Sequence, residues 1–206
     1  MPGMKKLGIK NVGVFKPRLT ETDTVKKIIL LIPFTSFSQF QALEESLERD
    51  QMYLAAGKDY LNVPYDKPAY LRTESILLEA FEGMPYIKAP LLEGDRAGRV
   101  YELRSYESAT EAYHNRKVDM FNAGGEIKLF ERLNFNAIFY ARVISGPRMP
   151  NLMYMISFAD EASRKAHWAA FTNSSEWTEL KAVPKYLNTV SHIDVSLLYP
   201  TEYSDY

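Results

Sequence analysis

The sequence predicts an α+β protein built from two tandem copies of a β-α-β-β-α-β unit. Three observations support this prediction: a strand, helix and glycine stop in residues 99–126, strand-like and helix-like apolar patterns on either side, and a match between the two halves at a shift of 124 residues. Such a unit folds as a four-stranded antiparallel sheet with both helices on one face. Its other face must be buried, so we expect the two units to face each other as an α/β barrel.

The strand at residues 100–106 is the clearest single element. Its side chains alternate between two faces. One face carries Tyr101, Leu103 and Ser105, and the other carries Glu102, Arg104 and Tyr106. An amphipathic strand of this kind belongs in a sheet that is covered on at least one side.

A helix is expected directly after this strand. Ser108 and Glu111 have the spacing of a capping box, in which each side chain bonds to a backbone amide of the first turn. The helix should run to about Asn122, and Gly124–Gly125 should end it because glycine accepts the left-handed conformation common at helix ends. Its expected buried stripe consists of Ala109, Ala112, Tyr113, Met120 and Phe121.

The first half shows the same kinds of element in a shorter series. A nearly continuous apolar run, KIILLIPF, predicts a buried strand at 27–34. Apolar residues at helical spacing (Phe37, Phe40, Leu43 and Leu47) predict a helix opening at 36–39. The remaining expected elements are a strand at 10–16, a short helix at 51–56, a loop at 64–68 and a long strand at 71–81.

The second half continues after the glycine stop. Its expected elements are strands at 136–145 and 151–158, a helix at 160–171, a short helix at 174–182 and a long strand at 189–199. A stretch rich in proline and glycine, at about 83–98, separates the halves and predicts a linker.

The two halves correspond when one is shifted by 124 residues. Val14–Phe15 then falls on Ile138–Phe139, 32–34 on 156–158, and Tyr53 on Trp177. An internal duplication is therefore predicted. We assign 1–90 to a first repeat that lacks its opening strand and helix, 99–200 to a complete second repeat, and 201–206 to a polar tail.

On these residues the chain resembles the NIPSNAP family of the dimeric α/β-barrel, ferredoxin-like superfamily. The matching segments are Tyr101–Ser108, His114, Arg116–Phe121, Met149–Met155, Trp168, Phe171, Glu176–Trp177, Asn11–Phe15, Ser75–Phe81 and Gly83–Pro85. The resemblance covers nearly the whole chain and implies two facing ferredoxin-like repeats. Family members usually have a complete first repeat, and the bacterial ones often carry an export signal; neither is visible in this sequence.

The resemblance implies a fold more than a reaction. The family has no agreed enzymatic activity, and its animal members are linked to mitochondria and to vesicle or mitophagy partners. Haem binding rests only on analogy with the superfamily. The absent opening strand would be a central one, so its neighbours would offer unpaired backbone groups to another chain. A homo-oligomer formed through sheet edges is therefore expected.

Composition excludes several classes of function. The formal charge of −1, with acids and bases mixed along the chain, gives no footprint for nucleic acid. The absence of cysteine excludes disulfides, thiol nucleophiles and thiolate metal sites. No stretch approaches 18 apolar residues, so we expect no membrane span and a soluble, cytoplasmic protein. No P-loop, G-x-G-x-x-G or G-x-S-x-G motif is present, so no cofactor is predicted.

The polar face of the central strand supplies the candidate binding site. If helices cover Tyr101 and Leu103, then Glu102, Arg104 and Tyr106 point into the barrel lumen. Tyr140 and Arg142 would join them from the next strand, and His192 or Asp194 from the last. Converging ion pairs and tyrosines can orient a small polar or aromatic ligand. The alternative is a Glu102–Arg104 salt bridge that fills a sealed interface between the repeats.

Two functions follow from these alternatives. An open lumen would bind a small molecule and could support cofactor-independent oxygenase or isomerase chemistry, as in some superfamily relatives. Arg104 or Arg142 would then hold an anionic oxygen, and Glu102 or His192 would move a proton. A filled barrel would instead favour a scaffold protein whose strand edge, or whose tyrosine-rich loop at 60–70, binds a partner.

Metal binding is not predicted. Glu111 and His114 have the Glu-x-x-His spacing of carboxylate-bridged iron sites, but such sites need a second copy of the motif. The histidines at 114, 167 and 192 show no H-x-x-x-H spacing.

Overall fold

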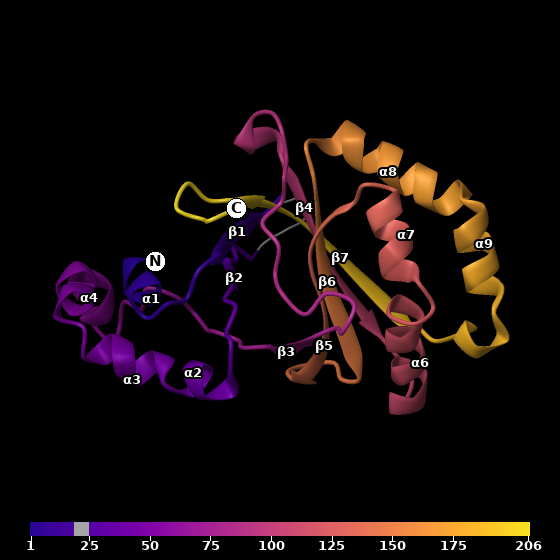
Figure 1. Ribbon diagram of the computed structural model, residues 1–206. Coiled ribbons are helices and arrows are strands. Elements are labelled where there is room, and N and C mark those ends of the chain that lie inside the picture. Colours follow the sequence, from indigo (N-terminus) through magenta and orange to yellow (C-terminus); the bar gives the residue numbers. More distant parts are fainter. Residues whose placement is uncertain (19–24) are drawn as a thin grey trace.

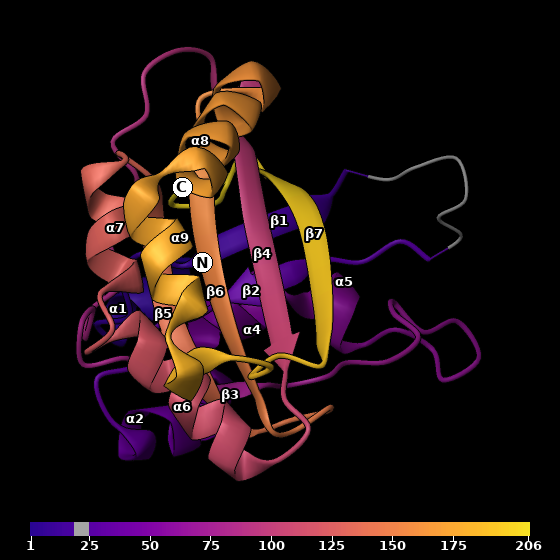
Figure 2. The same cartoon turned by 90° about the vertical axis from the view of Figure 1, so that its right-hand side faces the viewer.

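A curled antiparallel sheet of seven strands forms the centre of the molecule, shown as a computed structural model in Figures 1 and 2. The structure describes residues 1–18 and 25–206. Across the sheet the strands are β2 (Ile29–Leu31), β1 (Gly13–Pro17), β7 (His192–Pro200), β4 (Val100–Glu107), β6 (Asn151–Phe158), β5 (Asn136–Ser145) and β3 (Leu77–Ala80). Every neighbouring pair is antiparallel.

The second repeat is complete. Its strands lie in the order β7-β4-β6-β5, which is the order expected for a β-α-β-β-α-β unit. Four helices cover one face of this part of the sheet (Figure 1): α6 (Glu111–Phe121), α7 (Glu126–Arg132), α8 (Glu161–Asn173) and α9 (Ser175–Ala182). Helix α7 was not expected from the sequence.

The first repeat contributes three strands at the two edges of the sheet. Strand β1 pairs with β7, and β3 pairs with β5, so each edge of the second repeat is extended by a strand of the first. The helices of this half are α1 (Pro2–Lys6), α2 (Phe37–Gln41), α3 (Leu43–Glu48), α4 (Gln51–Ala56) and α5 (Lys58–Leu61). In Figure 1, α1–α4 lie on the side of the sheet away from α6–α9.

The open position in the sheet lies between β2 and β3. In the second repeat, the opening strand β4 lies between the last strand, β7, and the third strand, β6. The equivalents in the first repeat are β3 and β2, and no described segment lies between them. The predicted α+β, ferredoxin-like fold is therefore confirmed, and the described residues supply no strand at this position.

The shift of 124 residues also relates the helices and their caps. It carries Phe37 and Gln51, the first residues of α2 and α4, onto the first residues of α8 and α9. The N-caps correspond as well: Ser36 is equivalent to Asp160, and Asp50 to Ser174. All four side chains accept a hydrogen bond from a backbone amide of the first turn, as N-cap residues commonly do.

Three expectations for local structure were wrong. The strand expected to be buried at 27–34 is the three-residue β2, in which Leu30 is 55% exposed. The strand expected at 71–81 is reduced to Leu77–Ala80. Both border the open position, where a strand has a neighbour on one side only. The capping box is absent too, because Thr110 is the N-cap of α6 while the Ser108 hydroxyl donates to the Thr189 carbonyl at 2.7 Å.

Two apolar clusters occupy the two faces of the sheet. The cluster under α6–α9 includes Phe121, Phe130 and Tyr154, and the cluster on the opposite face, here called the inner face, includes Phe15 and Tyr101. The buried stripe of α6 differs from the expected one: Ala109, Ala112 and Tyr113 are not buried, whereas the buried residues are His114, Lys117, Val118, Met120 and Phe121.

The C-terminal segment closes one end of the inner face. Tyr206 is 4% exposed, and its ring packs on Phe15 and Tyr101. None of the helices in the described ranges combines the length and the apolar character that crossing a membrane requires.

Candidate functional site

The residues expected to line the barrel lumen lie on the opposite face of the sheet. Tyr101 and Leu103 belong to the inner cluster, so Glu102, Arg104 and Tyr106 point toward α6–α9. The condition for the expected lumen site, that helices cover Tyr101 and Leu103, is therefore not met. Alternation along a strand establishes that there are two faces, but both faces here carry aromatic residues, so the pattern does not show which face the helices cover.

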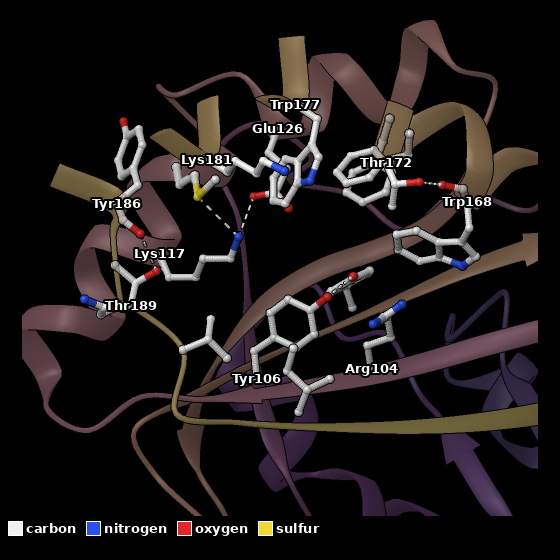
Figure 3. A pocket seen from close by; sticks show the side chains of 17 residues that line it. Arg104, Tyr106, Lys117, Glu126, Trp168, Thr172, Trp177, Lys181, Tyr186 and Thr189 are labelled. Atoms are coloured by element: carbon white, nitrogen blue, oxygen red, sulfur yellow. Dashed lines mark hydrogen bonds and ion pairs between the residues drawn. The ribbon is translucent and has the colours of Figure 1, made fainter. Parts of the chain in front are cut away.

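Arg104 and Tyr106 reach a pocket of about 410 Å³ between the sheet and α6–α9 (Figure 3), whereas Glu102 does not line it. The strands supply its floor and the helices supply its walls. Its lining is rich in aromatic rings, namely Tyr106, Phe130, Tyr154, Trp168, Phe171, Trp177 and Tyr186. Concave sites with apolar walls and a few polar groups are typical of small-molecule binding.

Arg104 is held at the floor of the pocket by a network behind it. Its Nη1 donates to Glu102 Oε1 at 2.8 Å, and its guanidinium lies 4.5 Å from the centre of the Trp168 ring. Glu102 is fully buried and also accepts from Arg164 Nε at 2.6 Å and from Trp168 Nε1 at 2.9 Å. This carboxylate therefore positions Arg104 and α8 together.

A second polar group, on α6 and α7, lies across the pocket from Arg104. Lys117 Nζ donates to Glu126 Oε2 at 2.7 Å, and their side chains are only 5% and 3% exposed. Lys117 is also within 4.7 Å of the Phe121 ring centre and 5.7 Å of that of Trp177. Aromatic faces stabilise a cation in such positions, which explains how a lysine is accommodated in a largely apolar wall.

Two tyrosine hydroxyls meet between these groups. The Tyr106 and Tyr154 hydroxyl oxygens are 2.8 Å apart. Burial raises the pKa of Tyr106 to about 12, and burial likewise raises the pKa of Tyr154 well above its usual value. Both phenols therefore stay protonated near neutral pH and act as neutral hydrogen-bonding groups.

The charges of the lining favour an anion. Three basic side chains (Arg104, Lys117 and Lys181) line the pocket, against one acidic side chain, Glu126. Glu102 offsets part of this charge from beneath the floor, but it is shared between Arg104 and Arg164.

The other predicted site residues lie elsewhere. Tyr140 is fully buried in the core, and it borders a smaller cavity of about 150 Å³ near Lys88 and Leu91. Arg142 is 41% exposed and pairs with Glu79 at 3.5 Å. His192 is on the inner face, because it lies opposite Glu107 in the ladder between β4 and β7. Of the predicted ligand-binding residues, only Arg104 and Tyr106 line the pocket.

Sequence reasoning missed most of the helical wall. Trp168 and Trp177 were named only for the family resemblance and the repeat, and neither they nor Lys117 and Glu126 were predicted as site residues. Their helical spacing could have placed the two tryptophans on the sheet-facing side. No sequence pattern pairs Lys117 with Glu126, because the turn at Gly124–Gly125 that brings them together begins an unexpected helix.

Comparisons with known proteins agree with this architecture. Residues 101–205, half of the chain, match the family model described as NIPSNAP. A monooxygenase candidate from Fusobacterium nucleatum is 9% identical and covers 93% of this chain and 76% of its own, with a TM-score of 0.59. A monooxygenase candidate from Lactobacillus acidophilus is 10% identical, with coverages of 96% and 82% and a TM-score of 0.55.

A NIPSNAP family protein from Agrobacterium tumefaciens is 17% identical and covers 52% of this chain and 97% of its own, with a TM-score of 0.45. No curated protein matches the sequence. At these identities, the two structures with the higher TM-scores establish a shared fold alone.

Proposed function

This chain belongs to the NIPSNAP family, and we propose that it binds a small amphipathic anion in the pocket between its sheet and α6–α9. The ligand would place an aromatic or apolar body among the rings of the walls and an anionic group at Arg104. The pocket volume of about 410 Å³ suits a molecule with one or two rings or a short acyl chain.

One observation above all supports this proposal. The Arg104 Nε–H is buried and has no hydrogen-bond partner, although Nη1 of the same guanidinium is paired with Glu102. An unpaired buried donor is destabilising unless a ligand or water satisfies it. A carboxylate, phosphate or enolate oxygen in the pocket would give this incompletely paired guanidinium a further acceptor, and its planar shape is well suited to such groups.

The geometry supports binding more strongly than it supports a particular reaction. Glu102 was expected to move a proton, but it is fully buried and does not line the pocket. Its carboxylate accepts hydrogen bonds from Arg104, Arg164 and Trp168. His192 is on the other face of the sheet. An oxygenase or isomerase reaction in this pocket would use Arg104 to stabilise an anionic oxygen, with the neutral hydroxyls of Tyr106 and Tyr154 beside it.

The chain provides its own probe for a binding test. It contains two tryptophans, Trp168 and Trp177, and both line the pocket. Intrinsic fluorescence therefore reports on this site. We expect 3-phenylpropanoate to change the fluorescence saturably, and its uncharged analogue 3-phenylpropanamide to bind at least about tenfold more weakly, because a charge-assisted hydrogen bond is lost.

Two variants distinguish direct contact with the ligand's anionic group from an indirect effect through Glu102. Arg104→Met removes the guanidinium and should reduce affinity for 3-phenylpropanoate by at least about tenfold. Arg164→Met is the matched control, because it removes the other guanidinium on Glu102 but does not line the pocket. Equal affinities for the acid and the amide, or equal losses in the two variants, would refute the assignment of Arg104 as the anion-binding group.

A second candidate function is self-association through the open position of the sheet. Within the described residues, the outer edges of β2 and β3 have no neighbouring strand, and Ile28 and Leu30 beside them are 62% and 55% exposed. Exposed edges and apolar side chains favour pairing with a second copy. Light scattering after gel filtration should show a dimer that Leu30→Lys weakens, whereas a monomer at all concentrations would contradict this candidate.

A further inference from the structure

A row of polar side chains crosses three strands on the inner face, on the side of the sheet away from the pocket. Glu107 on β4 lies opposite Asn151 on β6 and opposite His192 on β7. In the next row Ser105 lies opposite Asp194. The ligand atoms of Glu107, His192 and Asp194 all lie within 4.8 Å of one another. Among the described residues this is the one group of three or more metal-ligating side chains in such proximity.

We propose that Glu107, His192 and Asp194 bind a divalent first-row transition-metal ion on the inner face. One imidazole nitrogen and two carboxylates form a mixed nitrogen and oxygen set, which suits Zn²⁺, Co²⁺, Mn²⁺ or Fe²⁺ better than Mg²⁺ or Ca²⁺. Three protein ligands leave at least one coordination position for water or a substrate atom. His192 and Asp194 are separated by one residue on β7, so their side chains lie on the same face of the sheet. The strand backbone therefore already holds two of the three ligands next to each other.

Neighbouring acceptors without partners support this site independently. Asn151 is 2% exposed, and its Nδ2 donates to Ser105 Oγ at 3.1 Å, which places the amide on the same face as the three ligands. Its Oδ1 accepts no hydrogen bond, and Glu107 Oε1 is buried with no hydrogen bond, its one charged contact being the longer ion pair with Arg148. Buried acceptors are normally satisfied. A metal ion on Glu107 with a bound water would satisfy both oxygens.

In this structure the positive charge beside Glu107 and Asp194 comes from Arg148. Its guanidinium contacts Asp194 and lies 3.4 Å from Glu107 Oε1. The Arg148 side chain is 48% exposed and extends from the loop between β5 and β6, where its backbone adopts a left-handed φ of 60°. Ion pairs with this degree of exposure contribute little to stability. Arg148 therefore competes weakly with a divalent ion and can turn toward solvent when one binds.

The test uses the full chain without a histidine tag, titrated with Co²⁺, Zn²⁺ and Mg²⁺. We expect saturable Co²⁺ absorption in the visible range with one ion per chain, displacement of Co²⁺ by Zn²⁺, and no competition from Mg²⁺. His192→Ala and Asp194→Asn should each weaken Co²⁺ binding by at least about tenfold, since each removes one of three ligands. Arg148→Ala should tighten it by about three- to tenfold, because it removes the competing ion pairs.

Glu79→Gln provides the matched control. Like Asp194, Glu79 is a strand carboxylate paired with an arginine, in its case Arg142, but it lies outside the group of ligands. The site is supported if Glu79→Gln binds Co²⁺ as tightly as the wild type while Asp194→Asn loses affinity. No Co²⁺ binding to the wild type and to Arg148→Ala, or binding that survives both His192→Ala and Asp194→Asn, would overturn it. Because the pocket faces α6–α9, neither result depends on ligand binding there.

Discussion

The two repeats of this chain share a pattern but differ in how much they bury. Helices α6 and α7 of the second repeat bury residues such as Phe121 and Phe130, whereas in the described part of the first repeat α2–α5 bury none. The second repeat has its opening strand β4 and helix α6, for which the described part of the first repeat shows no counterpart. Helix α7 does have one, because the shift of 124 residues places the first residue of α1 on the first residue of α7, but α1 buries no residue. A repeat of this kind therefore forms its core chiefly around β4 and α6.

Equivalent positions make this difference specific. The shift of 124 residues pairs Leu30 of β2 with Tyr154 of β6, and both point to the outer side of their strands. Tyr154 is fully buried, whereas Leu30 is 55% exposed. The same strand position thus lies in a core in one repeat and at the surface in the other, so the predictions below compare equivalent or matched residues.

The largest effect is expected at this pair of strand positions. Tyr154→Ala should lower the free energy of unfolding by about 3–5 kcal/mol, because it removes a buried ring and leaves a cavity. Leu30→Ala should change it by less than about 0.5 kcal/mol, as for most exposed positions. Urea denaturation measures both changes. Similar losses at the two positions would show that the first repeat is as well packed as the second.

The ion pairs should show the next largest contrast. Glu126→Gln leaves Lys117 buried without its counter-charge, and breaking a buried pair costs about 3 kcal/mol or more. Glu45→Gln breaks the pair with Arg49, in which both side chains are at least 65% exposed, and should cost less than about 0.5 kcal/mol. The comparison fails if Glu126→Gln is as well tolerated as Glu45→Gln in the same denaturation experiment.

The equivalent N-caps should differ more modestly. Asp160→Ala removes the cap of α8, a helix of 13 residues, and should cost about 1 kcal/mol. Ser36→Ala removes the equivalent cap of α2, which has five residues and buries none, so we expect a smaller loss. Thermal unfolding of the two variants provides the measurement, and an equal or larger loss in Ser36→Ala would count against the contrast.

The smallest effect is a dependence on pH that resides in the second repeat. His114 is 6% exposed, and burial, with Arg142 nearby, lowers its pKa below the ordinary value of 6.5. Below pH 6.5 the unfolded chain therefore binds this proton more readily than the folded chain, and stability falls as pH falls.

Between pH 7.5 and 5.5, the wild type should lose more stability than His114→Gln. Carboxyl groups with lowered pKa values, such as Asp119 beside Lys185, titrate below the ordinary value of 3.8 and do not contribute in this window. Parallel slopes for the two proteins would contradict the assignment to His114.

Local patterns in the sequence predicted the repeat and most elements of the second half. They failed where a long-range neighbour decides the outcome. The run at 27–34 is apolar enough for a buried strand, but burial requires a partner strand that no described segment supplies at β2. The side of β4 that faces the helices could not be predicted, because Tyr101 and Tyr106 give its two faces similar character.

The candidate site was predictable only in part for the same reason. Arg104 and Tyr106 were recognised as a polar strand face, but the pocket also needs Lys117, Trp168 and Trp177 from three helices. The inner-face group of Glu107, His192 and Asp194 depends on the register between β4 and β7. A register between strands about 90 residues apart is fixed by packing, so spacing along the chain does not show it.

Native mass spectrometry tests the central claim most directly. We would compare gently purified wild type, Arg104→Met and Arg164→Met, each before and after addition of 3-phenylpropanoate. The account predicts a stoichiometric added mass on the wild type and on Arg164→Met that is strongly reduced on Arg104→Met. A bare chain mass for the wild type under both conditions, or an adduct that persists equally in Arg104→Met, would contradict an anion-binding pocket built on Arg104.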